Sequence, residues 1–339
     1  MRFGVFLLAA QFPGHDHSTV LGTMVAAAVA AEEAGFDEVW VAEHHFMSYG
    51  VCPSAITAAG YLLGATSRIV IGTAVSVLST VHPVALAEQA ALLDQLSGGR
   101  FHLGVGRGGP WIDLQVFGND LNGYRHGTEE SLNLLLAALT GPHVTAEGPR
   151  FRFPAVGLVP RPWTRPHPPV TLAATTPETV RLAAQRGLPL LLGMHADNTE
   201  KAAFIKEYDR VRGHDRIAGS PCQGHISTAL AYVADTQREA RSTIRTSLPQ
   251  WLGPGLNGYR RIDGSPTYPR DPRDYTELLC RIHPVGTAEH CIDMLAATTT
   301  ATGINHHILM VEGAGDWDRT KDNIQRLGAQ VLPRLRRAR

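Results

Sequence analysis

The sequence predicts a single (β/α)8 barrel that occupies residues 1–339, with insertions after the fourth and seventh strands. Short apolar, strand-like segments alternate with helix-like segments along the whole chain, and no change in composition separates its halves. Polar side chains also gather where apolar segments end, as in Glu43-His44-His45, Arg107 and Thr175. In a barrel, the carboxyl ends of the strands carry the active site. A doubly wound parallel sheet is the alternative topology.

The predicted strands are short apolar runs bounded by glycine, proline or charged residues, as expected of buried parallel strands. They are FGVFLL (3–8), FDEVWVAEHHF (36–46), RIVIGTAVSVL (68–78), RFHLGVG (100–106), PVTLAA (169–174), LPLLLG (188–193), HISTALAYV (225–233) and INHHILMVE (304–312).

The predicted helices follow the strands, and glycine or proline marks several of their ends. They cover 19–34, 53–65, 82–96, 128–139, 177–185, 198–212, 236–246, 287–296 and 317–334. A proline-rich connection is expected over 149–169 and an irregular segment over 249–284. Within the latter, residues 256–275 are rich in Gly, Pro, Tyr and Arg and are expected to form a mobile lid loop.

Composition excludes several classes of protein. The formal net charge is zero and no basic stripe is present, which argues against nucleic acid as a partner. We expect no signal peptide and no membrane span, because the longest apolar run, 24–31, is far too short to cross a bilayer. Cys52, Cys222, Cys280 and Cys291 form no CxxC pair, so we expect reduced thiols, no metal site and a cytoplasmic location.

The stretch FHLGVGRGGPW (101–111) contains Gly104-x-Gly106-x-x-Gly109, the spacing of a dinucleotide-binding turn. That turn belongs to a first βα unit whose helix starts within the glycines. Here the motif follows the fourth predicted strand, and no helix begins before Thr128. We therefore interpret the glycines as removing side chains beside Arg107, either for a close approach of a flat ligand or for a tight turn at the barrel rim.

A phosphate site is predicted from two features on the same face of the barrel. Thr175-Thr176-Pro177 suits a helix start, with Thr176 as N-cap, and the free amides of a helix start favour an anion. Arg107 and Arg125 lie in the loop after the fourth strand, and guanidinium groups bind phosphate oxygens in pairs. A capped helix and solvated arginines are the ordinary alternative for each feature taken alone.

The chain resembles the bacterial luciferase family of flavin-dependent monooxygenases, in particular its catalytic α subunits. The matching stretches are FGVFLL, GFDEVWVAEHHF, the block from Tyr61 to Gly108, VFGNDLNGYR, QRGLP, and HPVGTAEHCI with ATGIN after it. The resemblance covers nearly the whole chain, and the block that ends in GVGRG is its most specific part.

The resemblance implies a barrel that binds reduced FMN (FMNH2). It places the phosphate at Arg107, Arg125 and the helix start with Thr176 and Thr179, and a non-prolyl cis peptide at Ala74-Val75 beside the flavin ring. The expected cofactor-binding residues are Ala74, Val75, Gly106, Arg107, Arg125, Ala174, Thr175, Thr176 and Thr179. Two departures weaken any implied light emission: Gly106 replaces a reactive cysteine, and Thr175 a glutamate, of luciferase α subunits.

The implied reaction adds O2 to the reduced flavin at C4a, and the resulting (hydro)peroxide oxidises an aldehyde, a ketone or a polycyclic natural product. A separate flavin reductase is expected to supply the flavin, and a homodimer is expected. His44 matches the catalytic histidine; we expect it to titrate near neutrality and to face inward, with His45 on the opposite face and structural. The alternatives are an F420-dependent oxidoreductase and a non-catalytic flavin-binding partner subunit.

Overall fold

The predicted (β/α)8 barrel is confirmed. A computed structural model of the protein describes residues 1–213, 224–265 and 270–337. All strands of the main sheet are parallel, and the sheet closes because β3 pairs with both β2 and β5. The barrel strands are β1 (Arg2–Leu7), β2 (Glu38–Val41), β3 (Val70–Thr73), β5 (Phe101–Gly106), β8 (Val170–Ala174), β9 (Leu190–Leu192), β10 (Ile226–Leu230) and β13 (His306–Met310), with β4 (Ser76–Val77) added beside β5.

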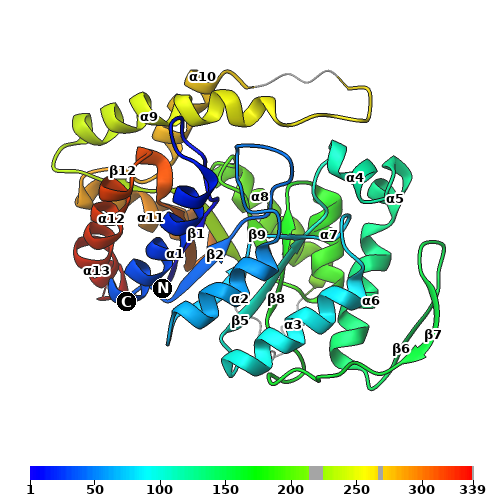
Figure 1. The fold of residues 1–339 in the computed structure, drawn as a ribbon. Helices are drawn as coiled ribbons and strands as arrows, with labels where there is room; N and C mark the ends of the chain where they lie inside the picture. Colours follow the sequence, from blue (N-terminus) through cyan, green and yellow to red (C-terminus); the bar gives the residue numbers. More distant parts are fainter. Residues whose placement is uncertain (214–223, 266–269, 338–339) are drawn as a thin grey trace.

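Helices surround the barrel, and a separate helical pair lies across one end of it (Figure 1). The helices that flank the strands are α1 (His17–Glu33), α2 (Ala55–Ala65), α3 (Pro83–Ser97), α6 (Thr128–Thr140), α7 (Pro177–Arg186), α8 (Asn198–Arg212), α11 (Ala288–Thr302), α12 (Trp317–Arg326) and α13 (Leu332–Arg337), the last two joined by a π-helical turn, η2 (Leu327–Val331). In the described part of the chain, no helix is long and apolar enough to cross a membrane.

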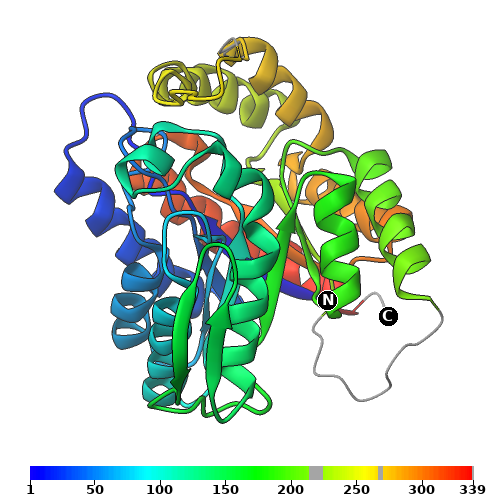
Figure 2. The ribbon, with the colours of Figure 1, turned by 90° about the vertical axis from the view of Figure 1, so that its right-hand side faces the viewer.

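Insertions follow the fourth and seventh barrel strands, as predicted. The first carries α4 (Ile112–Val116) and α5 (Leu121–His126), and the hairpin of β6 (Val144–Glu147) and β7 (Arg152–Val156) projects after α6. The second carries α9 (Gln237–Asn257) and α10 (Pro272–Ile282), which lie over the end of the barrel (Figure 2). The short strands β11 (Tyr232–Val233), before α9, and β12 (Val285–Gly286), after α10, pair with each other. A 3-10 turn, η1 (Glu312–Ala314), follows β13.

Three sequence predictions of local structure were wrong. The second strand ends at Val41 rather than at residue 46, and the third is interrupted at Ala74-Val75, whose peptide bond is cis. Residues 249–284 are largely helical, because α9 continues through Pro249 and Pro254 and α10 follows. A helix loses only single hydrogen bonds at such prolines, and Trp251 and Leu252 are fully buried beside them, so packing stabilises the helix.

The inward side chains of β2 define three levels of the barrel. Residues two apart on a strand face the same side, so Glu38, Trp40 and Ala42 follow one another along the interior. Trp40 fills the middle level, where a side-chain carbon added at Gly72 would lie 2.5 Å from its ring. Ala42 lines the cavity above it, and Glu38 lies at the opposite end. The barrel core is thus closed on one side of Trp40 and open on the other.

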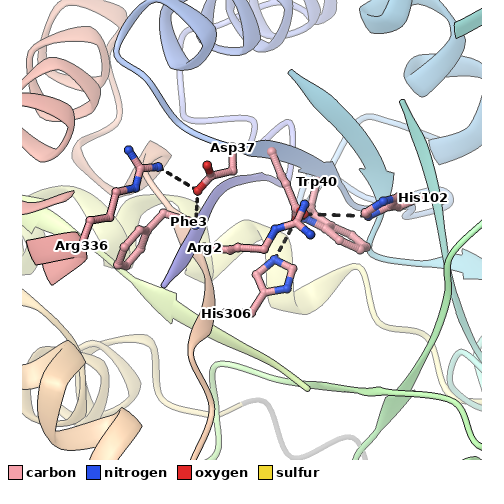
Figure 3. Close-up of polar contacts among 8 residues, drawn as sticks. Arg2, Phe3, Asp37, Trp40, His102, His306 and Arg336 are labelled. Atoms are coloured by element: carbon pink, nitrogen blue, oxygen red, sulfur yellow. Dashed lines mark hydrogen bonds and ion pairs between the residues drawn. The ribbon is translucent and has the colours of Figure 1, made fainter. Parts of the chain in front are cut away.

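A buried polar cluster closes the amino-terminal end of the barrel (Figure 3). The Trp40 indole N–H donates to Glu38 Oε2 at 2.6 Å, and His306 Nε2 lies 2.6 Å from the same oxygen. Arg2 pairs with the other oxygen, and His102 Nδ1 lies 3.9 Å from it. Burial alone would raise the pKa of Glu38, but His306, His102 and Arg2 lower it to about 2. The carboxylate is therefore charged and fully compensated.

Candidate functional site

A cavity of about 670 Å³ opens at the carboxyl ends of the barrel strands. Its floor is apolar and consists of inward side chains of the upper barrel level, among them Phe6, Ala42, Ala173 and Leu191. The loops after β2 and β5 form one wall, and the carboxyl-terminal turn of α9 with the segment after it forms the other. A largely apolar cavity at this end of a barrel is the expected place for ligand binding and chemistry.

His44 and His45 both line this cavity, which corrects the prediction that they face opposite ways. The alternation rule applies only within a strand, and β2 ends at Val41, three residues before His44. The backbone N–H of His44 donates to the carbonyl of Cys52, and its Nδ1 is buried without a partner in the described chain. His45 Nε2 lies 3.4 Å from Glu43 Oε1.

The predicted titration of His44 near neutrality is also wrong. Burial, with a smaller contribution from the charge of His45, lowers the pKa of His44 to about 4. The ring of Tyr49 packs edge-on against the imidazole, with centroids 5.0 Å apart, and excludes water from it. His44 is therefore a neutral imidazole at physiological pH, able to accept a proton at an unpaired nitrogen.

Two acidic residues of the cavity wall were not predicted as site residues. Glu43 accepts hydrogen bonds from the amides of Ala55 and Val77, which joins the loop after β2 to the start of α2 and to β4. Asp113 at the start of α4 lines the cavity, and burial raises its pKa. The Glu43 carboxylate could be recognised in the sequence by its position before His44, whereas Asp113 reaches the cavity only because the insertion after β5 folds back over it.

A second hollow, of about 380 Å³, lies at the rim beside α5 and α7. It brings together the predicted phosphate residues Arg107, Arg125 and Thr179, and adds Arg181. Neither Arg107 nor Arg125 has a carboxylate partner in the part of the chain that the structure describes, and Arg107 lies over the ring of Tyr124, 4.5 Å from its centroid. Uncompensated guanidinium groups beside a helix start favour a bound anion.

The start of α7 is built as predicted, with Thr176 as N-cap and Pro177 at the first helical position. Thr176 accepts a hydrogen bond from the amide of Thr179, so its own hydroxyl is already engaged at the helix start. Glu178, which was not predicted, also lines the rim hollow. Hydrogen bonds from its own amide and from Thr176 lower the pKa of its exposed carboxylate, so this acid competes for the same amides as an incoming anion.

The remaining predicted cofactor residues either line the large cavity or are buried at strand ends beside it. Ala74, Val75 and Thr175 line the large cavity, and so does Gly108, the residue after Arg107 in the sequence. Gly106 and Ala174 are buried strand ends that line neither hollow. A side-chain carbon added at Gly106 would lie 2.8 Å from Val75 Cγ2, and one at Gly104 would lie 1.9 Å from the carbonyl oxygen of Thr73. The glycines therefore serve close packing of neighbouring strands, in agreement with the rejection of a dinucleotide turn.

A strap, residues 259–263, closes part of the cavity mouth. Its backbone pairs with the loop after β5: the amide of Ile112 donates to the carbonyl of Arg260, and the amide of Ile262 donates to that of Pro110. Arg261 also lies over the ring of Trp111, 5.4 Å from its centroid. The predicted lid over 256–275 is thus tied down in part; residues 266–269 lie outside the described residues, and its closure on a ligand stays a prediction.

A barrel with an arginine-lined rim hollow beside an apolar cavity suits a phosphorylated, largely planar ligand. The chain matches the luciferase-like monooxygenase family model over residues 1–306 and belongs to that family. It is therefore a luciferase-like, flavin-dependent monooxygenase.

The chain is similar over its whole length to alkanal monooxygenase α chains. Identity is 31% with that of the Kryptophanaron alfredi symbiont, over 99% of both chains. It is 33% with that of Photorhabdus laumondii, over 99% of this chain and 98% of the relative. The β chain of Photobacterium leiognathi is 29% identical over 96% of both.

Solved structures share the fold. The monooxygenase RslO1 from Streptomyces bottropensis superposes with a TM-score of 0.86 at 22% identity, over 98% of this chain and 99% of that one. The oxygenating constituent of 3,6-diketocamphane monooxygenase from Pseudomonas putida, in complex with FMN, superposes with a TM-score of 0.78 at 18% identity. The superposition covers 99% of this chain and 98% of that one. An F420-dependent secondary alcohol dehydrogenase gives 0.75 at 20% identity, over 98% of both.

Proposed function

We propose that the protein is a monooxygenase that uses reduced FMN and O2, with the flavin supplied by a separate reductase. The observation that carries the proposal is the adjacency of two uncompensated cations, Arg107 and Arg125, to a cavity that holds a buried neutral histidine, His44. The relatives at about 30% identity are named alkanal monooxygenases, and one protein of the same fold was solved with FMN.

The residues present fit FMN. Arg107, Arg125 and Thr179 offer cationic and hydroxyl donors to a phosphate, and among the described residues Arg107 forms no ion pair, although its charge acts on Glu178 across the hollow. Ala74, Val75 and Ala173 offer an apolar surface for a flat ring system at the neighbouring cavity. When bound in its reduced form, FMN would supply the electrons that activate O2.

The chain's own residues have two roles in such a reaction. His44 accepts or returns a proton at Nδ1, which is buried and has no hydrogen-bond partner among the described residues. Phe6, Leu8 and Val77 and the strap limit the access of water to the cavity, which protects a reactive oxygen species from premature loss. Glu43 fixes the segment that carries the histidine pair, since its carboxylate accepts hydrogen bonds from the first residue of α2 and from β4.

A homodimer in the cytoplasm completes the proposal. Large apolar side chains are exposed together on α2 and α3: Tyr61 is 67%, Leu92 46% and Leu96 75% exposed. Such a surface is unusual on a monomer and suits contact with a second copy. The three described cysteines, Cys52, Cys280 and Cys291, are free and buried, as in a reducing compartment.

The proposal is tested by an oxygen-transfer assay. The purified enzyme, a flavin reductase, NADH, FMN and ¹⁸O2 are incubated with a panel of aldehydes, ketones and polycyclic phenols, and products are analysed by mass spectrometry. We expect one ¹⁸O atom in a product, and its loss in the His44→Ala variant. A protein that binds reduced FMN but transfers no oxygen to any member would instead support the non-catalytic partner subunit.

A further inference from the structure

Three tyrosines from separate segments meet at the upper wall of the large cavity. Tyr49 lies in the loop after β2, Tyr259 in the strap, and Tyr275 in the first turn of α10. Arg270, just before α10, lines the cavity beside them. None of these residues belongs to the predicted flavin site, so this wall is available to a second ligand.

The rings of this wall form flat aromatic surfaces. Tyr49 packs against Trp251 with ring centroids 4.5 Å apart and against Tyr259 at 5.5 Å. Tyr259 in turn lies 4.7 Å from Trp111. Each ring is thus in contact with its neighbours, and Tyr49, Tyr259 and Trp111 all line the cavity, with Tyr259 tilted by 59° to Tyr49 and by 55° to Trp111. Such a surface favours a planar aromatic ligand over a flexible alkyl chain, because stacking needs a flat partner.

The same tyrosines offer hydrogen-bond donors. Among the described residues, the only hydrogen bond found for Tyr49 outside the backbone ladder is to its carbonyl, from Trp251, so its hydroxyl is available, as is that of Tyr259; the Tyr275 hydroxyl interacts with Arg270 and can still donate its own proton. Burial raises the pKa of Tyr49, Tyr259 and Tyr275, so all three phenols stay protonated at physiological pH. A protonated phenol donates to an oxygen atom, and it donates most strongly to an anionic one.

Arg270 adds an uncompensated positive charge. Its guanidinium carbon lies 4.8 Å from the centroid of the Tyr275 ring, and it forms no ion pair with a described residue. Arg261, the other cavity arginine, is neutralised by Asp263 at 2.5 Å. The acids of the cavity are held by backbone amides, Glu43 by Ala55 and Val77 and Asp113 by Leu114. Asp113 is near enough to Tyr259 for its charge to add to burial in raising the pKa of that phenol, whereas Arg270 acts on Tyr275. An anionic group on a ligand is therefore stabilised most where it lies beside the positive charge of Arg270.

We propose that the cavity selects a planar aromatic substrate that carries an acidic oxygen, a ring carboxylate or an acidic phenol, rather than a long-chain aldehyde. The aromatic body lies against Tyr49 and Tyr259, and the acidic oxygen accepts hydrogen bonds from Tyr259 and Tyr275 beside Arg270. This assignment of a substrate class rests on the proposed function, but binding alone tests it.

The test is a binding titration of the flavin-free, full-length protein with four probes that separate planarity from charge: 2-naphthoate, 2-acetonaphthone, decanoate and decanal. Quenching of tryptophan fluorescence reports binding, since Trp111 and Trp251 adjoin the tyrosines. We expect 2-naphthoate to bind at least about tenfold more tightly than each other probe, the factor of one charge-assisted hydrogen bond. Equal or tighter binding of decanal or decanoate would overturn the proposal.

Variants assign the effect to the wall. Tyr259→Phe and Tyr275→Phe keep the rings and remove the donors, and Arg270→Gln removes the charge. Each substitution should weaken the binding of 2-naphthoate by roughly 3- to 10-fold and leave the affinity for 2-acetonaphthone unchanged. Tyr61→Phe on exposed α2 is the matched control, and thermal melting verifies folding. Unchanged affinity in all three variants would refute the assignment. A parallel FMN titration of the wild type separates failure of this proposal from failure of the proposed function.

Discussion

The imidazole of His44 packs edge-on against the ring of Tyr49, with ring centroids 5.0 Å apart and planes at 72°. Tyr49 is in turn fixed from behind by Trp251, whose indole N–H donates to the Tyr49 carbonyl at 3.0 Å. A residue of α9 therefore holds the ring that covers the proposed catalytic base. This contact links the helical insertion after β10 to the chemistry expected at the end of β2.

His44→Ala is expected to lower turnover by about 10²- to 10⁴-fold with FMN affinity unchanged, because the imidazole moves a proton and does not hold the cofactor. Since burial lowers the pKa of His44 to about 4, the base is present at neutral pH and is lost only as the pH falls through about 4. Titration of His44 should therefore cause no change in the steady-state rate between about pH 5 and pH 8. A fully active His44→Ala enzyme would contradict its assigned role.

Arg107→Ala should weaken FMN binding by about 1.5–3 kcal/mol, the value of a charge-assisted hydrogen bond. Arg107→Lys should recover part of the loss, because it restores the charge but not the paired donors. Calorimetric titration measures both. Arg245→Ala serves as the control, since Arg245 pairs with Glu277 on α10 and lines neither hollow. Equal affinities of the Arg107→Ala and Arg245→Ala proteins would place the phosphate elsewhere.

Gly106→Ala is expected to cost about 1–3 kcal/mol of unfolding free energy, because the new carbon would lie 2.8 Å from Val75 Cγ2. The double variant Gly106→Ala/Val75→Ala should regain most of that loss, since it removes the opposing atom. Gly104→Ala should not be rescued in this way, because its carbon meets the backbone oxygen of Thr73. Urea unfolding measures all of them, and additive losses in the double variant would argue against the contact.

The local motifs of this site were predictable from the sequence, and its distant parts were not. The cap at Thr176, Arg107 and the histidine pair each follow a strand within a few residues, so their positions depend only on the barrel topology. Arg125 lies in α5 of the insertion and was expected at the phosphate only from the family resemblance. Tyr259 and Tyr275 reach the cavity through a long insertion whose prolines indicated irregular structure, yet burial of Trp251 and Leu252 keeps α9 helical past Pro249. Likewise, the period of two failed at His45 because β2 ends at Val41 and the histidines lie in the loop after it.

Glu38→Gln should destabilise the protein by about 1.5–3 kcal/mol at pH 7, since the buried Trp40 indole loses a charged hydrogen-bond acceptor and the partly exposed Arg2 loses its ion pair. The folded pKa of Glu38, about 2, lies below its ordinary value of 4.5. Its stabilisation is therefore fully present above pH 4.5 and is lost as the pH falls from 4.5 toward 2. The stability difference between wild type and variant, followed by urea unfolding, should shrink over that range. A difference that is constant with pH would argue against a charged Glu38.

The central claim, that the rim and the cavity together hold reduced FMN, is tested most directly by anaerobic calorimetric titration of the wild-type protein with photoreduced FMN and, in parallel, with reduced F420. We predict one FMN bound per chain at micromolar or lower concentration and no comparable binding of F420. Tight binding of F420 without binding of reduced FMN would contradict the claim and identify the chain as an F420-dependent oxidoreductase.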